Sequence, residues 1–155
     1  MIGNPFIFYR ISHGITLRIT TMAMNFNAFM EGFAREIGGQ FSEYDKTKSV
    51  IIVPLDDNRF QTVLGVLRYN DRYDREGIEF SSKICDFESG IDTTELLRIH
   101  TRFTHARFAL VGQSLKVEAS TNLTSVTDAL LKEIILEVAV LADEWELKLT
   151  GMDVH

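Results

Sequence analysis

Apolar residues recur along this chain with two periods, one typical of helices and one typical of strands. The first regular run begins after Asn25, a favourable N-cap, and ends at the stop signal formed by Gly38 and Gly39. Within it, apolar side chains repeat every three or four residues, which predicts a helix. These residues are Phe26, Phe29, Met30, Phe33 and Ile37.

The next runs have the composition and spacing of strands. Ser49–Leu55 is β-branched and is followed by the turn-forming Asp56–Asn58, and Arg59–Tyr69 comes directly afterwards. Together they predict a hairpin. After a charged turn at Asn70–Gly77, apolar and polar residues alternate over Ile78–Cys85 and predict a third strand.

A second helix and a second hairpin are expected in the following segment. Asp92 and Glu95 have the spacing of a capping box, which predicts a short helix. Its apolar face holds Leu96, Ile99, His100 and Phe103. Further on, Arg107–Val111 and Ser114–Ala119 flank Gly112 and Gln113, a connection that suits a type II′ turn.

A long helix closes the pattern. Ser125 or Thr124 is its expected N-cap, and Gly151 its expected end. One apolar stripe contains Leu130, Ile134, Val138, Leu141, Trp145 and Leu149, and Leu131, Ile135, Ala139 and Ala142 widen it. The predicted order is α-β-β-β-α-β-β-α, and most strand connections are too short for parallel crossovers. We therefore expect a single α+β domain over residues 24–155, with helices packed on an antiparallel sheet of about five strands.

Residues 1–23 differ from the rest of the chain in composition. They contain Arg10 and Arg18 but no acidic residue, and Arg10, Ser12 and His13 interrupt their apolar stretches. A secretory signal has an unbroken apolar region, so this segment does not fit one. We expect a flexible N-terminal arm, or an upstream extension of a reading frame whose functional start is Met24.

Charge and cysteine usage narrow the range of partners. Sixteen basic and twenty-two acidic residues give a net charge of −6, which disfavours binding to the phosphates of nucleic acid. The single cysteine, Cys85, cannot form an internal disulfide, so the chain suits a reducing compartment such as the cytoplasm. Its longest apolar run, Ile134–Ala142, is interrupted by Glu137, which predicts no membrane span.

No group of residues forms a recognisable catalytic, metal or cofactor motif. Glycine-rich phosphate loops are absent from the sequence. His100 and His105 are five residues apart, so a helix would separate them by roughly 140° and would not direct both at one metal ion. The acidic cluster Asp71, Asp74, Glu76 and Glu79 is interpreted as a solvated turn, and Asp143, Glu144 and Glu146 are expected to point mostly outward.

The distribution of apolar residues favours a protein-binding function. The first hairpin is apolar on both faces, whereas Ser114–Ala119 has one apolar and one polar face. We expect the second apolar face to bind a partner protein or another copy of the chain, unless the N-terminal arm or a helix covers it. The candidate interface consists of Ile51, Val53, Val63, Leu67 and Tyr69.

The predicted order, the small acidic chain and the closing run LKVEASTNLTSVTDALLKEIILEVAVLADEWE resemble the type III secretion chaperone fold, and more closely its YbjN-type relatives. The resemblance covers Asn25–Leu149. It implies a cytoplasmic homodimer that acts as a chaperone or adaptor and uses no cofactor. An enzyme or small-ligand-binding protein without a recognisable motif is the alternative.

Overall fold

A six-stranded antiparallel sheet lies at the centre of the computed structural model, which describes residues 25–151. The strands follow the spatial order β1-β2-β3-β4-β6-β5. Their bounds are β1 (Gln40–Asp45), β2 (Lys48–Pro54), β3 (Phe60–Asn70), β4 (Arg75–Asp86), β5 (Arg107–Val111) and β6 (Ser114–Asn122). The predicted α+β class is therefore confirmed, and the proposed arm at 1–23 lies outside the described residues.

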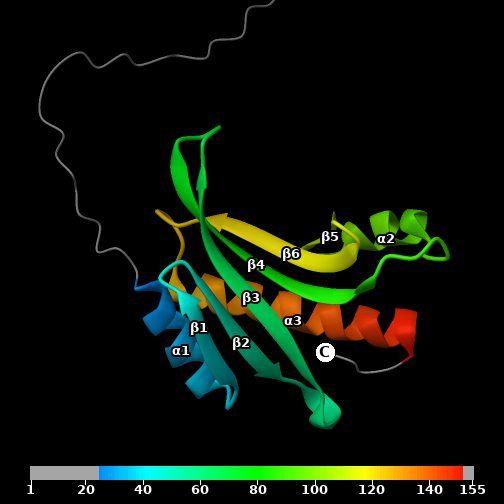
Figure 1. Ribbon diagram of the computed structural model, residues 1–155, viewed down its shortest axis with the longest axis horizontal. Helices are drawn as coiled ribbons and strands as arrows, with labels where there is room; N and C mark the ends of the chain where they lie inside the picture. Colours follow the sequence, from blue (N-terminus) through cyan, green and yellow to red (C-terminus); the bar gives the residue numbers. More distant parts are fainter. Residues whose placement is uncertain (1–24, 152–155) are drawn as a thin grey trace, which may run out of the picture.

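The helices α1 (Phe26–Glu36) and α3 (Asp128–Thr150) lie on the same side of this sheet (Figure 1). α1 packs on β1 and β2, and α3 crosses β3, β4 and β6. The third helix, α2 (Thr93–His100), packs beside the edge strand β5. The apolar core lies between the sheet and these helices, and its largest fully buried side chains include Phe80, Met30, Ile51, Ile78, Ile84 and Leu131.

Strand β1 corrects the predicted element order, because the sequence pattern indicated only a polar stretch there. The strand has five exposed residues, and only Phe41 packs partly against the core. It pairs with β2 through backbone hydrogen bonds, with Phe41 opposite Ile51. An edge strand with so little apolar surface lacks the alternation on which strand prediction depends.

The helix ends agree with the sequence at four of five expected signals, and one of these is Gly38, which follows the end of α1 with a φ of 70°. Asn25 caps α1 by accepting a hydrogen bond from the Ala28 amide at 3.1 Å, and Asp92 caps α2. Gly151 ends α3 in the left-handed conformation, with φ of 68°. The N-cap of α3 is Thr127, however, whose hydroxyl accepts from the Leu130 amide at 3.2 Å. Several hydroxyl residues precede this helix, and the path of the chain selects among them.

Gly65 sets how closely α1 approaches the sheet. A Cβ atom at this position would lie 2.8 Å from the Met30 Sδ-methyl carbon and 2.9 Å from the ring of Phe26, both on α1. It would also lie 3.1 Å from the ring of Phe80 on β4. The missing side chain therefore makes room for the large residues that α1 buries.

Two acidic residues of α3 are buried, which corrects the prediction that they point outward. The Asp143 side chain is 6% exposed and binds the Arg59 guanidinium, whose Nε lies 3.0 Å from Oδ1 and whose Nη2 lies 3.0 Å from Oδ2. Arg59 immediately precedes β3, so this ion pair joins the helix to the start of a central strand. Such a bidentate pair fixes orientation as well as distance.

Glu146 is the second buried acid, with 1% of its surface exposed. Its carboxylate accepts a hydrogen bond from the Gln61 side-chain amide at 2.8 Å. The Gln61 carbonyl oxygen lies 3.1 Å from the Ser82 hydroxyl and accepts from the Thr62 amide at 3.1 Å. A buried polar group without such partners would destabilise the fold, so this network fixes how α3 sits on β3 and β4.

We predict that Asp143→Ala lowers the free energy of unfolding by about 2–4 kcal/mol, because it leaves the Arg59 guanidinium without its buried partner. Urea denaturation of Asp143→Ala, Arg59→Ala and the double variant measures the coupling between the two residues. We expect a favourable coupling of about 1–3 kcal/mol. Strictly additive effects would contradict a structural role for this ion pair.

Candidate functional site

The structure places the predicted interface residues mainly on the helix-covered face of the sheet. Ile51, Val53 and Val63 have no exposed surface (0%), and Leu67 packs against the core. Tyr69 is exposed near the end of β3, where its hydroxyl hydrogen-bonds to Asp74. The three buried residues cannot contact a partner in this fold. Sequence alternation shows that two faces are apolar, but it does not show which face the helices cover.

The neighbouring residues on the same strands form the apolar surface of the opposite face. Val50 pairs with Leu64, and Ile52 pairs with Thr62, so these side chains alternate with the buried ones. None of the three described helices packs on this side, which faces the viewer in Figure 1. We call this surface the open-face patch, and it consists of Val50, Ile52, Pro54, Phe60, Leu64 and Val66.

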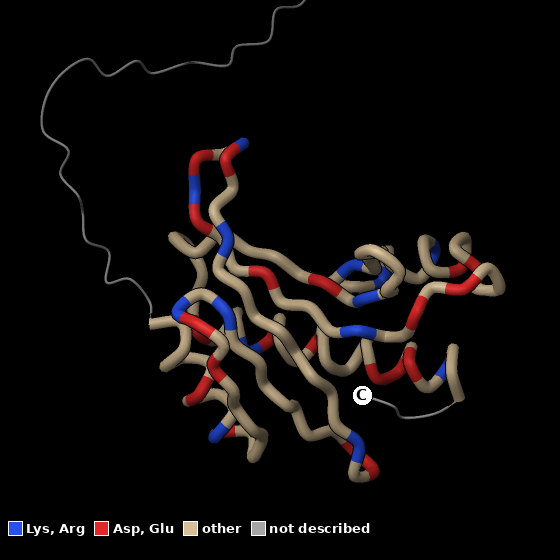
Figure 2. Tube along the Cα trace, viewed as in Figure 1, with Lys and Arg blue, Asp and Glu red and all other residues tan. Residues whose placement is uncertain are grey.

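The patch has an apolar centre and a charged margin. β2 and β3 carry a charge only at Lys48 and Arg68, near one end of each strand, as Figure 2 shows. Across β4 and β6 the same face becomes polar, with Lys83 opposite Lys116 and Ser81 opposite Glu118. An apolar centre with a polar rim is the usual anatomy of a protein-binding surface.

Two shallow hollows extend the open-face patch. One, of about 360 Å³, lies at the end of the patch and is lined by Ile52, Pro54, Phe60 and neighbouring residues. The other, of about 320 Å³, lies where the patch meets its polar margin, between Leu64, Ser81 and Lys116. Such hollows can receive side chains that project from an extended or helical partner segment.

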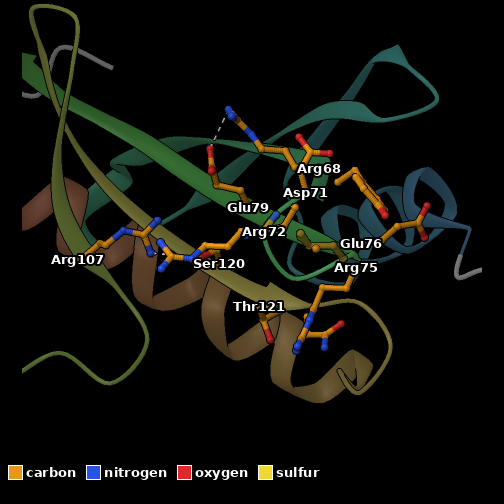
Figure 3. Close-up of a pocket in the computed structure, with 14 residues that line it drawn as sticks. Arg68, Asp71, Arg72, Arg75, Glu76, Glu79, Arg107, Ser120 and Thr121 are labelled. Atoms are coloured by element: carbon orange, nitrogen blue, oxygen red, sulfur yellow. Dashed lines mark hydrogen bonds and ion pairs between the residues drawn. The ribbon is translucent and has the colours of Figure 1, made fainter. Parts of the chain in front are cut away.

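A larger hollow of about 670 Å³ lies at the foot of the β3–β4 hairpin, and half of the residues that line it are charged (Figure 3). Arg68 pairs with Glu79 at 3.1 Å, and Arg107 contacts Ser120 and Glu118 at 3.3 and 3.5 Å. Charges of both signs alternate along the hairpin. Four arginines and three acidic residues line the hollow, and this near balance is typical of a solvated hairpin.

The two histidines that were considered as metal ligands lie in different surroundings. The His100 ring stacks on Phe103 with 6.0 Å between ring centroids and belongs to an aromatic cluster that continues through Phe108 to Trp145. His105 lies beside Glu133, with Nε2 3.4 Å from the carboxylate. Within residues 25–151, no three histidine, cysteine or acidic side chains are grouped so that they could hold a metal ion.

Cys85 is half-buried on β4. Burial raises the pKa of its thiol, and the nearby carboxylates of Asp86 and Glu88 raise it further. The thiol therefore stays protonated at neutral pH, which makes it a poor nucleophile.

None of the described helices is long and apolar enough to cross a lipid bilayer.

We predict that charged substitutions at two adjacent positions of β3 change the stability of the fold by very different amounts. Val63→Asp places a carboxylate in the core and should lower the free energy of unfolding by more than about 3 kcal/mol, or prevent folding. Leu64→Asp places the same group on the open face and should change it by about 1 kcal/mol or less. Urea denaturation of both variants tests which face the helices cover. Equal destabilisation would contradict the assignment of the open face.

Comparisons with known proteins bear on the fold. No protein-family model matches this chain, and no curated protein matches it. Among solved structures, the chain is similar to a chain of the HopA1-SchA chaperone-effector complex, with a TM-score of 0.54 and 14% sequence identity. The match covers 81% of this chain and 95% of that one. The expected chaperone-like fold is thereby confirmed, whereas the match does not point to the YbjN-type relatives in particular.

Proposed function

We propose that this protein is a non-enzymatic chaperone or adaptor that binds another protein through the open-face patch. The observation that carries the proposal is the row of apolar side chains across β2 and β3 that no described helix covers. Apolar surface of this kind is stabilised when a partner removes it from water. The similarity to a chain of a chaperone-effector complex supports a protein as the partner.

The chemistry of the described residues fits a binding function better than a catalytic one. The Cys85 thiol has a raised pKa, and two of the four arginines that line the hairpin hollow, Arg68 and Arg107, are paired with carboxylates. The open-face patch itself consists of aliphatic and aromatic side chains, which bind by burial. Together with the single unpaired cysteine, these features are consistent with a chaperone that works in the cytoplasm.

We further propose that the protein forms a homodimer through the end of the domain where α2 and β5 meet. β5 is an edge strand, so one row of its backbone hydrogen-bonding groups has no neighbouring strand in the sheet. Leu110 and Val111 on β5 and Leu97 on α2 are exposed there. Edge strands with exposed apolar side chains favour association with another chain, and a two-fold arrangement would bury both copies of this surface.

Photocrosslinking tests the binding site in the cells that produce the protein. A photoreactive phenylalanine analogue at Thr62, an exposed position within the open face, should give a discrete adduct with a partner. Adding Leu64→Asp should abolish the adduct by placing a charge in the contact. The same analogue at Ala28, on the exposed surface of α1, serves as the control.

An adduct from Ala28 equal to that from Thr62 would contradict binding at the open face, and so would the absence of any adduct from Thr62. A Thr62 adduct at twice the mass of the chain would assign this face to self-association instead.

Sedimentation equilibrium tests the homodimer. We expect a mass near twice 17.7 kDa for the wild-type protein and near 17.7 kDa for Leu110→Lys, because the substitution puts unpaired charges into the contact. Tyr44→Lys, at an exposed position on the opposite edge strand β1, is the control and should remain a dimer. A wild-type protein that is monomeric at high concentration would contradict self-association, and a dimeric Leu110→Lys would place the contact elsewhere.

A further inference from the structure

The helix α3 is apolar on two sides, and only one side faces the core. Its inner side contributes fully buried residues such as Leu131, Ile135 and Val138. On its outer side, Leu136, Val140 and Leu147 remain 40%, 41% and 43% exposed. A helix that already packs on a sheet normally turns a polar face outward. We call these three residues the α3 outer stripe.

The spacing of the α3 outer stripe is that of a helix-packing seam. Steps of four and seven residues place the three side chains within about 40° of one another around the helix axis. The same heptad register also includes Asp143, between Val140 and Leu147, and the Arg59 guanidinium binds this carboxylate. Single exposed apolar residues are common on protein surfaces, but a row in register along one helix is a continuous surface for another helix.

The surroundings of the stripe are acidic. α3 carries two lysines and six acidic residues, and of these acids only Asp143 and Glu146 are buried. Glu133, Glu137 and Glu144 follow one margin of the stripe, within about 40° of one another. Figure 2 shows the charged positions along the helix.

The lysines do not neutralise this margin, because both bind acids from other helices. Lys132 pairs with Glu36 of α1, and Lys148 pairs with Glu95 of α2 at 2.6 Å. Glu137 accepts the amides of Thr104 and His105 at 2.6 and 2.8 Å. Glu133 is 65% exposed at its side chain, and among residues 25–151 its one ion-pair contact is the His105 ring at 3.4 Å. The margin therefore presents negative charge to any molecule that covers the stripe.

We propose that the α3 outer stripe is a second docking surface and that its occupant is a basic amphipathic helix of a partner protein. The apolar seam would take the apolar face of that helix, and the acidic margin would attract its lysines and arginines. A second copy of this chain fits less well, because it would bring the same acidic margin, Glu133, Glu137 and Glu144, to this surface. This surface lies on the helical side of the domain, away from the open-face patch, so both could be occupied together.

A designed peptide tests the chemistry of this site. The probe is a fluorescent amphipathic helix with leucine at the a and d positions of each heptad and lysine at the others, and the control peptide has glutamate in place of lysine. Fluorescence anisotropy with the full chain should show saturable binding of the lysine peptide, at least about tenfold tighter than that of the glutamate peptide. Raising the salt concentration should weaken the binding of the lysine peptide, because salt screens the exposed charges of the acidic margin.

Matched variants locate the binding site. The double variant Val140→Ser, Leu147→Ser should have about tenfold lower affinity for the lysine peptide. Tyr44→Ser, at an exposed position on β1, and Leu64→Asp, on the open face, should leave the affinity within about twofold. Thermal melts of each variant confirm that it is folded.

Three results of the peptide titrations would overturn the proposal: no saturable binding of the lysine peptide, equal binding of the glutamate peptide, or binding that the stripe variant does not change. A wild-type dimer that the stripe variant converts to a monomer would also overturn it, by assigning the stripe to a second copy of the chain. Loss of peptide binding in Leu64→Asp alone would assign the peptide to the open-face patch and leave the stripe without support.

Discussion

The packing of α3 across β3, β4 and β6 is the interaction on which the rest of this structure depends. The helix buries seven apolar residues against the sheet and also two carboxylates, Asp143 and Glu146. These carboxylates bind Arg59 and Gln61 at the start of β3. The contacts fix both the position of α3 along its own axis and its distance from the sheet. Apolar burial supplies the driving force, and the buried polar contacts select one arrangement among those that burial allows.

The position of α3 also decides which side of the sheet remains accessible. With α1 and α3 on one side, the odd-numbered residues Ile51, Val53 and Val63 become core, and their even-numbered neighbours form the open-face patch. β2 and β3 are apolar on both faces, but the described helices cover only one of the two faces. The candidate site is therefore the part of the apolar sheet that the fold leaves uncovered.

The similarity to a chain of a chaperone-effector complex fits this arrangement, although the two sequences are only 14% identical. At such low identity, what the match shows is a shared fold. Hydrophobic periodicity and burial maintain a fold, and many different side chains satisfy both requirements. The particular residues of each surface are not fixed by the fold, and here they are aliphatic and aromatic side chains on the open face and acids along α3.

The sequence alone determined most of the elements and the fold class. The structure follows three kinds of local signal. These are the helical spacing from Phe26 and from Leu130, the caps at Asn25 and Asp92, and the glycines at 38, 112 and 151. Local signals suffice there because helix caps and turns depend on residues only a few positions apart.

The tertiary structure alone decided the remaining features. Strand β1 forms because β2 offers it a backbone ladder, and its own sequence has almost no apolar alternation. Asp143 and Glu146 are buried because Arg59 and Gln61 bind them. These partners lie more than eighty residues away in sequence, so no local signal indicates the burial. The sequence placed Val63 in the candidate interface, but the helices cover the face that holds Val63, so the exposed apolar surface contains its neighbour Leu64 instead. A period of two shows that a strand has two faces, but only the packing of distant helices determines which face becomes the core.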